Sequence, residues 1–311
     1  MMKVIYGINK IRKFMKPVVA LGVFDGVHRG HRCILKAVVD KAKRIGGISI
    51  VVTFSPHPQR EGSIYSLEHR LRLISDVGID TSIVIKFNKK FSQMPAEDFI
   101  RDVLINKIGA RYIYVGRNFR FGKEAKGDFK TLERLSHLYN FRLKVFDIIK
   151  IDNQPISSTY IRSLITKGKL NIAGKLLSMP VSVMGTVIRG TSLATRLGFP
   201  TANINPHHEV LPPSGVYVAL VIFNNKKFKG VCNIGTKPTF LDHQKQKHIE
   251  VYIFNFRKNI YSKYLEIQFI KKIRNEKKFN SSQSLVRQIK KDIAQTREFF
   301  SSIFHATRYA H

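Results

Sequence analysis

One change of pattern along the chain limits the folds that it can adopt. Up to about residue 150, strand-like apolar segments alternate with segments of helical spacing, whereas after about residue 180 strand-like segments follow one another directly. Strands that alternate with helices form parallel sheets with right-handed crossovers. Closely spaced strands without helices favour an antiparallel barrel or sandwich. We therefore expect two domains, residues 1–180 and 181–311, with the boundary near Met179-Pro180.

The expected elements follow from apolar periodicity. In the first half, strands are expected at 18–25, 48–54, 82–87 and 111–116, and helices at 31–44, 66–78 and 96–109. The first helix would bury Ile34, Leu35, Val38 and Ala42 and end at Gly46-Gly47. In the second half, strands are expected at 181–188, 215–223, 227–235, 249–256 and 264–270, with a hairpin turn at Asn224-Asn225. An amphipathic helix from Ser282 to Phe300 would bury Leu285, Ile289 and Ile293.

The turn GVFDGVHRGH, residues 22–31, lies where the first long strand meets the first long helix. Helix N-termini bind phosphate through unpaired N–H groups, and Gly26 and Gly30 let the backbone approach a ligand closely. His28 and His31 add two donors that can stabilise charge on a phosphoryl group under attack. One alternative is a metal site, for which two histidines are too few alone. The other is a turn whose histidines have no function.

Charge is the strongest compositional feature, with 54 Lys and Arg against 21 Asp and Glu and a net charge of +33. Three explanations stay open: a general bias toward lysine, substrate phosphates, or a polyanion such as RNA. No run approaches eighteen apolar residues and no secretory signal is evident, so neither a membrane span nor export is expected. Cys33 and Cys232 form no CxxC pair, which suits a reducing cytoplasm.

Several motifs of the first half together resemble a known family. The HxGH motif at His28–His31 resembles that of nucleotidylyltransferases related to class I aminoacyl-tRNA synthetases. LGVFDGVHRGH is more closely similar to the N-terminal module of the bacterial bifunctional riboflavin kinase/FAD synthetase family. VTFSPHP (52–58), VGRNFRFGKEAKGD (115–128) and ISSTYIR (156–162) resemble further motifs of that module. The resemblance implies a Rossmann-like α/β FMN adenylyltransferase domain.

The resemblance also implies site residues in this domain. His28, His31 and Arg162 would act in catalysis, and nucleotide and phosphate contacts would come from Gly22, Phe24, Asp25, Gly26, Gly30, Ser157, Ser158 and Thr159. Flavin contacts would come from Asn118, Phe119 and Phe121. Judged from residue types alone, Ser157–Thr159 equally fit a helix N-cap without a ligand. The two phenylalanines equally fit simple packing.

The second half carries the motifs of a riboflavin kinase. GTVIRGTSLATRLGFPTANI (185–204), GVYVALV (215–221) and GVCNIGTKPTF (230–240) resemble that domain. The resemblance implies that Thr201 and Asn203 hold Mg²⁺ and nucleotide phosphates, although PTAN taken alone is typical of an ordinary turn. Strand alternation would place Glu250, Tyr252, Phe254 and Phe256 on one face. The resemblance makes Glu250 the catalytic base; the alternative is an exposed glutamate at a strand start.

These motifs predict a two-step enzyme that uses ATP and Mg²⁺. Riboflavin would be phosphorylated to FMN, with ADP released, in a C-terminal antiparallel β-barrel that carries a terminal helix. FMN would then be converted to FAD, with pyrophosphate released, in the N-terminal domain. No specific nucleic acid and no membrane partner are expected. Two alternatives remain: an RNA-binding protein, and an enzyme that has lost the kinase because Ala194-Thr195 replaces the family's Gly-Arg or Gly-Lys.

Overall fold

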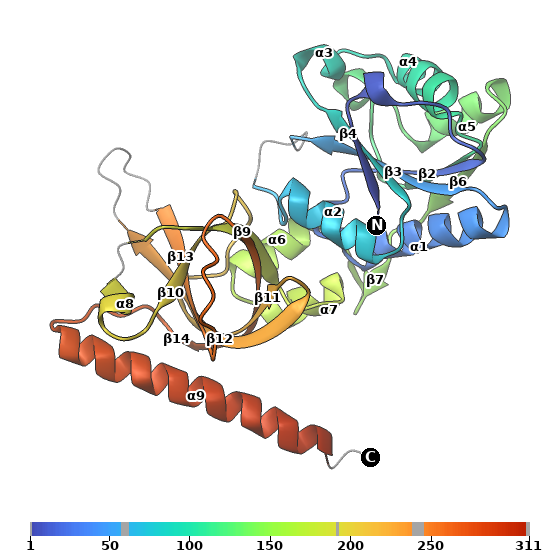
Figure 1. The fold of residues 1–311 in the computed structure, drawn as a ribbon. Helices are drawn as coiled ribbons and strands as arrows, with labels where there is room; N and C mark the ends of the chain where they lie inside the picture. Colours follow the sequence, from blue (N-terminus) through green and yellow to red (C-terminus); the bar gives the residue numbers. More distant parts are fainter. Residues whose placement is uncertain (1, 57–61, 191–192, 238–245, 309–311) are drawn as a thin grey trace. The chain divides into compact units, whose positions relative to one another are not determined.

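The computed structural model describes residues 2–56, 62–190, 193–237 and 246–308 (Figure 1). It divides into two compact units, Met1–Tyr160 and Ile161–His311, which are described separately below. The boundary predicted near Met179-Pro180 marks the change of strand pattern and stays a prediction. Among the described residues, no helix is long and apolar enough to cross a membrane.

A parallel sheet forms the centre of the first unit. Within the described residues its order is β1-β4-β3-β2-β5-β6, and every neighbouring pair is parallel, so the predicted α/β class is confirmed. The strands are β1 (Lys3–Tyr6), β2 (Pro17–Leu21), β3 (Ile48–Ser55), β4 (Thr81–Lys86), β5 (Tyr112–Gly116) and β6 (Arg142–Phe146). The expected strands did not include β1 or β6, which are short, lie at the two edges of the sheet and bury few of their residues.

Helices connect these strands. The longer ones are α1 (Arg29–Arg44), α2 (Leu67–Asp76), α5 (Phe129–Leu138) and α4 (Ala96–Asp98), which continues as the π-helical segment η3 (Phe99–Ile108). Short turns of helix are η1 (Ile8–Lys10), η2 (Asp25–Val27), α3 (Lys89–Ser92) and η4 (Lys123–Ala125), and a small hairpin pairs β7 (Lys150–Ile151) with β8 (Gln154–Pro155). The buried face predicted for the first helix is confirmed, since Ile34, Leu35, Val38 and Ala42 are all buried.

The order of the strands places the HxGH turn at the switch point of the sheet. From β2 the chain proceeds to β3 and β4 on one side, and later to β5 and β6 on the other (Figure 1). Helix α1 follows β2 directly and packs on β2, β3 and β5. In open parallel sheets, ligands bind at the carboxyl ends of the strands beside such a point. The fold therefore puts the most unusual turn of the sequence where a ligand site is expected.

The second unit contains a closed antiparallel barrel. Its order among the described residues is β10-β13-β12-β11-β14-β9, closed by the pairing of β9 with β10, so the barrel is the correct choice between the two predicted forms. The strands are β9 (Ser182–Ile188), β10 (Thr201–Asn205), β11 (Gly215–Phe223), β12 (Lys226–Lys237), β13 (Gln246–Ile253) and β14 (Tyr264–Arg274). The hairpin at Asn224-Asn225 is confirmed, with left-handed φ of 48° and 60°. The helices are α6 (Ser158–Thr166), α7 (Leu170–Leu177), α8 (Leu193–Arg196) and α9 (Ser282–Arg308).

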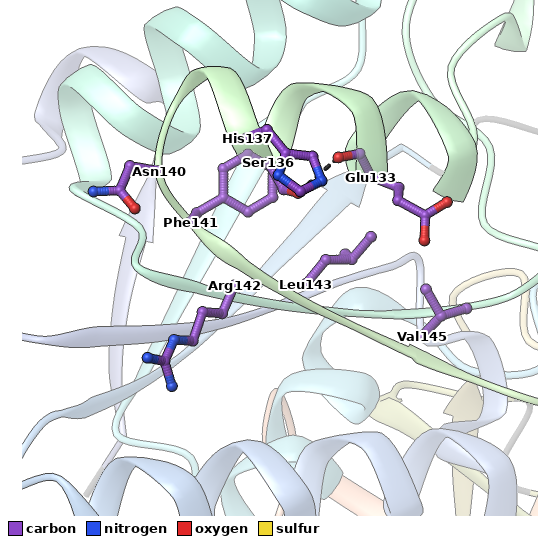
Figure 2. Close-up of a pocket in the computed structure, with 8 residues that line it drawn as sticks. All are labelled: Glu133, Ser136, His137, Asn140, Phe141, Arg142, Leu143 and Val145. Carbon is purple, nitrogen blue, oxygen red and sulfur yellow. Dashed lines mark hydrogen bonds between the residues drawn. The ribbon is translucent and has the colours of Figure 1, made fainter.

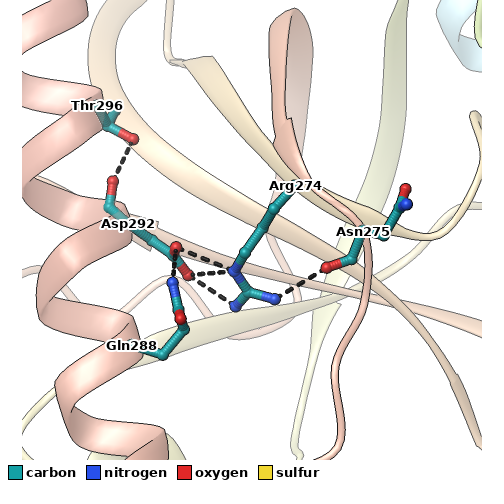
Figure 3. Close-up of polar contacts among 5 residues, drawn as sticks. All are labelled: Arg274, Asn275, Gln288, Asp292 and Thr296. Carbon is teal, nitrogen blue, oxygen red and sulfur yellow. Dashed lines mark hydrogen bonds and ion pairs between the residues drawn. The ribbon is translucent and has the colours of Figure 1, made fainter.

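Helix α9 runs to Arg308, beyond the predicted end at Phe300, and a buried ion pair attaches it to the barrel (Figure 3). Arg274, the last residue of β14, places Nη2 2.7 Å from Oδ2 of Asp292, and its Nε donates to both oxygens of the same carboxylate. Asp292 is 4% exposed and also accepts a hydrogen bond from Gln288 at 2.8 Å. The pair therefore fixes the end of a barrel strand to the middle of the helix.

Candidate active sites

The HxGH turn has an unusual backbone. Phe24 and Val27 adopt left-handed φ values of 56° and 39°, and Gly26 lies at 80°. A left-handed valine is an outlier, and such strain persists only where the surroundings fix it. His28 is the N-cap of α1, and its Nδ1 accepts a hydrogen bond from the His31 backbone N–H at 3.3 Å. The turn therefore begins the helix with an imidazole in the capping position.

The two predicted histidines lie against each other. Their rings stack with centroids 3.6 Å apart and planes inclined by 17°, and the edge of Phe24 meets His31 at 5.3 Å. Burial lowers the pKa of His28 to about 4. Burial, followed by the charges of His28 and Arg70, lowers the pKa of His31 below its usual value. Both imidazoles are therefore neutral at pH 7 in the free protein, and each offers an N–H donor rather than a positive charge.

Gly22 and Gly30 of the turn each lie close to an aromatic ring. A Cβ at Gly22 would come within 3.0 Å of the Phe24 ring, and one at Gly30 would come within 3.2 Å of the His28 ring. Phe24 itself is buried, at 2% exposed. These contacts explain why glycine stands two residues before Phe24 and two residues after His28. Whether the glycines also contact a nucleotide stays a prediction.

Asp25 holds the turn to the segment that precedes α2. It is 2% exposed, and its carboxylate accepts hydrogen bonds from the backbone N–H groups of Ile64 at 3.1 Å and Tyr65 at 3.3 Å. These hydrogen bonds give the Asp25 carboxylate a structural role. A phosphate contact by Asp25 stays a prediction.

The structure brings the ISST segment to the same turn. The Ser158 hydroxyl donates to the Asp25 carbonyl oxygen at 2.9 Å, which joins two motifs 133 positions apart. Ser157 accepts a hydrogen bond from the Tyr160 backbone N–H at 3.2 Å and so caps α6, as the residue types predict. Thr159 is exposed beside them. Arg162 lies further along α6, beyond the division between the two units, so its place relative to the turn stays a prediction.

The loop after β5 carries the three residues predicted to bind flavin. Phe121 is 6% exposed and belongs to the apolar core, with its ring 5.9 Å from that of Phe99. Phe119 stacks on Phe121 at 5.5 Å but is only partly buried, and Asn118 is exposed. Two alternatives were predicted for these rings, flavin contact and simple packing, and Phe121 fits packing. Phe119 retains ring surface that a flavin can contact.

In the barrel, strand register gathers the predicted kinase residues. Asn203 of β10 pairs directly with Glu250 of β13, which pairs on its other side with Asn233 of β12. Thr201 pairs in the same way with Tyr252. Directly paired residues project from the same face of a sheet, so these polar side chains form one row. PTAN is therefore the start of a strand, and the interpretation of it as a turn is wrong.

Two further features define this row. A Cβ at Gly190 would come within 2.1 Å of Nδ2 of Asn203, so only glycine allows the Asn203 side chain its position. The predicted alternation holds for Glu250 and Tyr252 but ends at Ile253, because Asn255 takes a left-handed φ of 54°. Phe254 and Phe256 lie beyond the end of the strand: Phe254 is buried with its ring against Tyr252, and Phe256 packs on Phe223 and Phe228, so their place on that face stays a prediction.

Some parts of the predicted motifs lie outside the described residues. They are His57 and Pro58 of the first half, and Thr191, Ser192, Pro238, Thr239 and Phe240 of the second. A pocket of about 690 Å³ lies between α5 and β6 and is lined by none of the predicted residues (Figure 2). Its lining residues are Glu133, Ser136, His137, Asn140, Phe141, Arg142, Leu143 and Val145.

Arg70 is a residue near the turn that the sequence analysis missed. It is 3% exposed on α2 and donates to oxygens at the carboxyl ends of β2 and β3. The position of Arg70 in α2 could have indicated this burial. Arg70 lies four residues before the buried Ile74, on the same face of the helix, which packs inward. A charged residue at such a position needs a buried partner.

Comparison with known proteins defines the class of this chain. Residues 10–160 match the FAD synthetase family, and residues 177–300 match the riboflavin kinase family. The two matches fall on the parallel-sheet region and on the barrel, respectively. The class is therefore a two-domain enzyme of flavin cofactor synthesis.

The chain belongs to the bifunctional riboflavin kinase/FMN adenylyltransferase family. It is 36% identical to the member from Buchnera aphidicola subsp. Schizaphis graminum, covering 97% of this chain and 100% of the relative. It is 32% identical to the member from Escherichia coli strain K12, covering 96% and 98%. A solved structure described as a macrolide-efflux protein from Streptococcus pneumoniae shares the fold, with a TM-score of 0.80, 27% identity, and coverage of 95% and 99%.

Proposed function

We propose that this protein converts riboflavin to FMN and then FMN to FAD, with ATP as co-substrate in both steps. We assign the kinase to residues 181–311 and the adenylyltransferase to residues 1–180. The observation that carries the proposal is the presence of two separate polar sites, each built from the motifs of one activity: the HxGH turn with Ser158, and the Asn203–Glu250 row. Membership of a family that combines both activities supports it.

In the adenylyl transfer, a phosphate oxygen of FMN attacks the α-phosphorus of ATP, and the bond to the departing pyrophosphate breaks. Negative charge then builds up on the oxygens of the α-phosphoryl group. His28 and His31 donate neutral N–H groups toward this charge, and the first turn of α1 adds backbone N–H groups. Ser157, Ser158, Thr159 and Arg162 hold the phosphates from the ISST segment. No covalent intermediate is needed, because positioning and charge stabilisation supply the catalysis.

In the phosphorylation, the terminal ribityl hydroxyl of riboflavin attacks the γ-phosphorus of ATP, and ADP leaves. Glu250 accepts the proton of that hydroxyl as general base. Its position between Asn203 and Asn233 supports this role, since both neighbours carry amide groups that can orient a carboxylate. Thr201 and Asn203 face the nucleotide phosphates from the same side of the barrel.

The polar row of the barrel fits Mg²⁺. Mg²⁺ prefers oxygen ligands and is usually held by one or two carboxylates together with water and substrate phosphates. Thr201, Asn203 and Glu250 supply a hydroxyl, an amide oxygen and one carboxylate. The described residues contain no cluster of three or more His, Cys, Asp or Glu, which agrees with a metal held mainly by the nucleotide. When bound, Mg²⁺ neutralises charge on the phosphates.

The high positive charge serves substrate phosphates rather than a specific nucleic acid in this proposal. Basic and aromatic side chains do meet on β5 and β6, as an RNA-binding surface requires. However, Nζ of Lys41 lies 4.4 Å from the centre of the Tyr112 ring, and Nζ of Lys144 lies 5.0 Å from that of Phe146. The protein's own cations cover these rings, so they are poor platforms for bases. We place the protein in the cytoplasm, where its substrates are made available as soluble compounds.

The direct test is incubation of the protein with riboflavin, ATP and Mg²⁺, followed by chromatographic separation of the flavins. We expect FMN to appear first and FAD to follow. A second incubation that starts from FMN isolates the adenylyl transfer. Folded protein that produces neither FMN nor FAD would contradict the proposal.

A further inference from the structure

A buried cation, the guanidinium of Arg70, lies next to the HxGH turn. Arg70 of α2 is 3% exposed, and a guanidinium so placed is costly unless its N–H groups find acceptors. Within the part of the chain that the structure describes, its N–H groups donate to oxygens of β3 and of Val23, just after β2. The planar guanidinium of arginine carries several N–H donors, so it can bond to more than one backbone oxygen at once.

The hydrogen bonds of Arg70 join the carboxyl ends of β2 and β3. Its Nη1 donates to the Val23 carbonyl oxygen and to Oγ1 of Thr53 at 3.4 Å, and its Nη2 donates to the Phe54 carbonyl oxygen at 3.2 Å. The Thr53 hydroxyl donates to the same Val23 carbonyl at 3.0 Å. The Val23 carbonyl therefore receives two hydrogen bonds, both from buried side chains.

Val23 is the residue at which the strained turn begins. The next residue, Phe24, has the left-handed φ of 56°, and Val27 follows at 39°. Further along, the Asp25 carboxylate is held by Ile64 and Tyr65, and the Asp25 carbonyl by Ser158. The hydrogen bonds to Val23 therefore add to the contacts that hold the turn on both sides of Phe24.

We propose that Arg70 is a positioning residue for adenylyl transfer, which holds His28 and His31 in place by fixing the Val23 carbonyl without touching the nucleotide. The proposal rests on the adenylyltransferase function given above. The cation has a second effect, because it opposes protonation of His31; the charged or titratable groups that act on His31 are His28 and Arg70. Burial lowers the pKa of Arg70 itself, and the Asp25 and Glu68 carboxylates oppose that shift.

The test compares four variants with the native chain, with FMN and ATP as substrates. Arg70→Met removes both the hydrogen bonds and the charge, Arg70→Lys retains the charge, and Thr53→Val removes the second donor to Val23. Arg72→Met is the matched control, since Arg72 lies on the same helix and forms a surface pair with Asp76 at 3.7 Å. The kinase reaction of each variant, started from riboflavin, measures whether the barrel is intact.

We expect Arg70→Met to lower kcat for FAD formation about a hundredfold, the scale of a misplaced catalytic group, with the KM for ATP nearly unchanged. Thr53→Val should lower kcat about tenfold, which corresponds to one hydrogen bond. The acid limb of the pH profile should move to higher pH in Arg70→Met, because His31 is then protonated more easily, and should stay in place in Arg70→Lys. Arg72→Met should behave as the native chain does.

Two results would overturn the proposal. One is a native kcat in folded Arg70→Met; the other is a raised KM for ATP with kcat unchanged, which would make Arg70 a nucleotide ligand. If Arg70→Met does not fold, native kcat in both Thr53→Val and Arg70→Lys overturns it instead. A native chain that makes no FAD from FMN contradicts the proposed function itself, so the two failures are distinguishable.

Discussion

The two candidate sites are built in opposite ways. In the first unit, the histidines lie in a strained turn fixed by buried hydrogen bonds, and their imidazoles are neutral. In the barrel, the polar residues stand at paired positions of regular strands, and Asn203 and Glu250 are only partly buried. The first site therefore depends on the conformation of a turn, and the second on strand register.

This difference determines which substitutions should damage each site. A turn held by buried contacts is sensitive to changes far behind the ligand, as proposed for Arg70. A site built on register tolerates such changes but is sensitive to anything that displaces a strand or fills the space beside it. The following predictions test this contrast.

The largest effect is expected on the attachment of α9 to the barrel. Asp292→Ala leaves Arg274 buried without its carboxylate, so the free energy of unfolding of the second unit should fall by about 3–5 kcal/mol. The exposed pair of Arg101 and Asp102 in the first unit is the control, and Asp102→Ala should leave stability almost unchanged. Chemical denaturation of the full chain, followed by hydrogen exchange in each unit, measures both. Equal losses in the two variants would contradict the burial argument.

The next effect concerns pH and the first unit alone. The pKa of His28 falls from 6.5 to about 4 on folding, so the unfolded chain binds a proton more readily between these values. Stability present above pH 6.5 is therefore lost as pH falls toward 4, by about 3 kcal/mol from this group. Hydrogen exchange of α1 amides across this range should show the loss.

His28→Asn provides the control for this titration. Asparagine is a good N-cap and does not titrate, so it should retain the start of α1 and weaken the pH dependence. The barrel should show no matching trend in the native chain. A pH dependence that is the same in the variant would exclude His28 as its source.

A third prediction concerns the close contact beside Asn203. Gly190→Ala places a Cβ within 2.1 Å of the present position of Asn203 Nδ2, so the Asn203 side chain must move. FMN formation should fall by about a hundredfold, as expected when a positioning group is displaced. FAD formation from supplied FMN should be unchanged. Steady-state rates of both reactions measure these effects. A native rate of FMN formation in Gly190→Ala would show that the position of Asn203 is unimportant.

The smallest effect is expected from separating the units. Residues 181–311 expressed alone should retain the kinase, because the Asn203–Glu250 row is built entirely from strands of the barrel. Residues 161–311, which add most of α6 and all of α7, should be more stable without being faster. A folded 181–311 fragment that makes no FMN would move the domain boundary toward residue 160 and show that the added helices are needed.

The sequence predicted the long elements and the motif-bearing turns well, because each had a strong local signal. The buried face of α1 and the Asn224-Asn225 hairpin are examples. The prediction was weaker where structure depends on distant partners. β10 became a strand only through its pairing with β9 and β13, and the strand alternation after Ile253 was broken by a left-handed asparagine.

The candidate sites show the same limit. Motifs identified the histidines and Glu250, but nothing in the sequence showed that His28 and His31 stack or that both are neutral. Arg70 was missed because its partners, two backbone oxygens and the Thr53 hydroxyl, include no acidic residue that the sequence could have suggested as a partner. The contact between Ser158 and Asp25 likewise depends on the completed fold.

The central claim is that one chain carries two separate phosphate-transfer sites, and a pair of variants tests it most directly. In Glu250→Gln, FMN formation should fall by about a hundredfold or more, the usual scale for a general base, while FAD formation from supplied FMN stays at the native rate. His31→Ala should do the reverse and stop the reaction at FMN. The double variant should show the two losses independently, because sites that share no partners seldom couple. If Glu250→Gln reduced FAD formation from FMN as strongly as it reduced phosphorylation, the assignment of two separate sites would be contradicted.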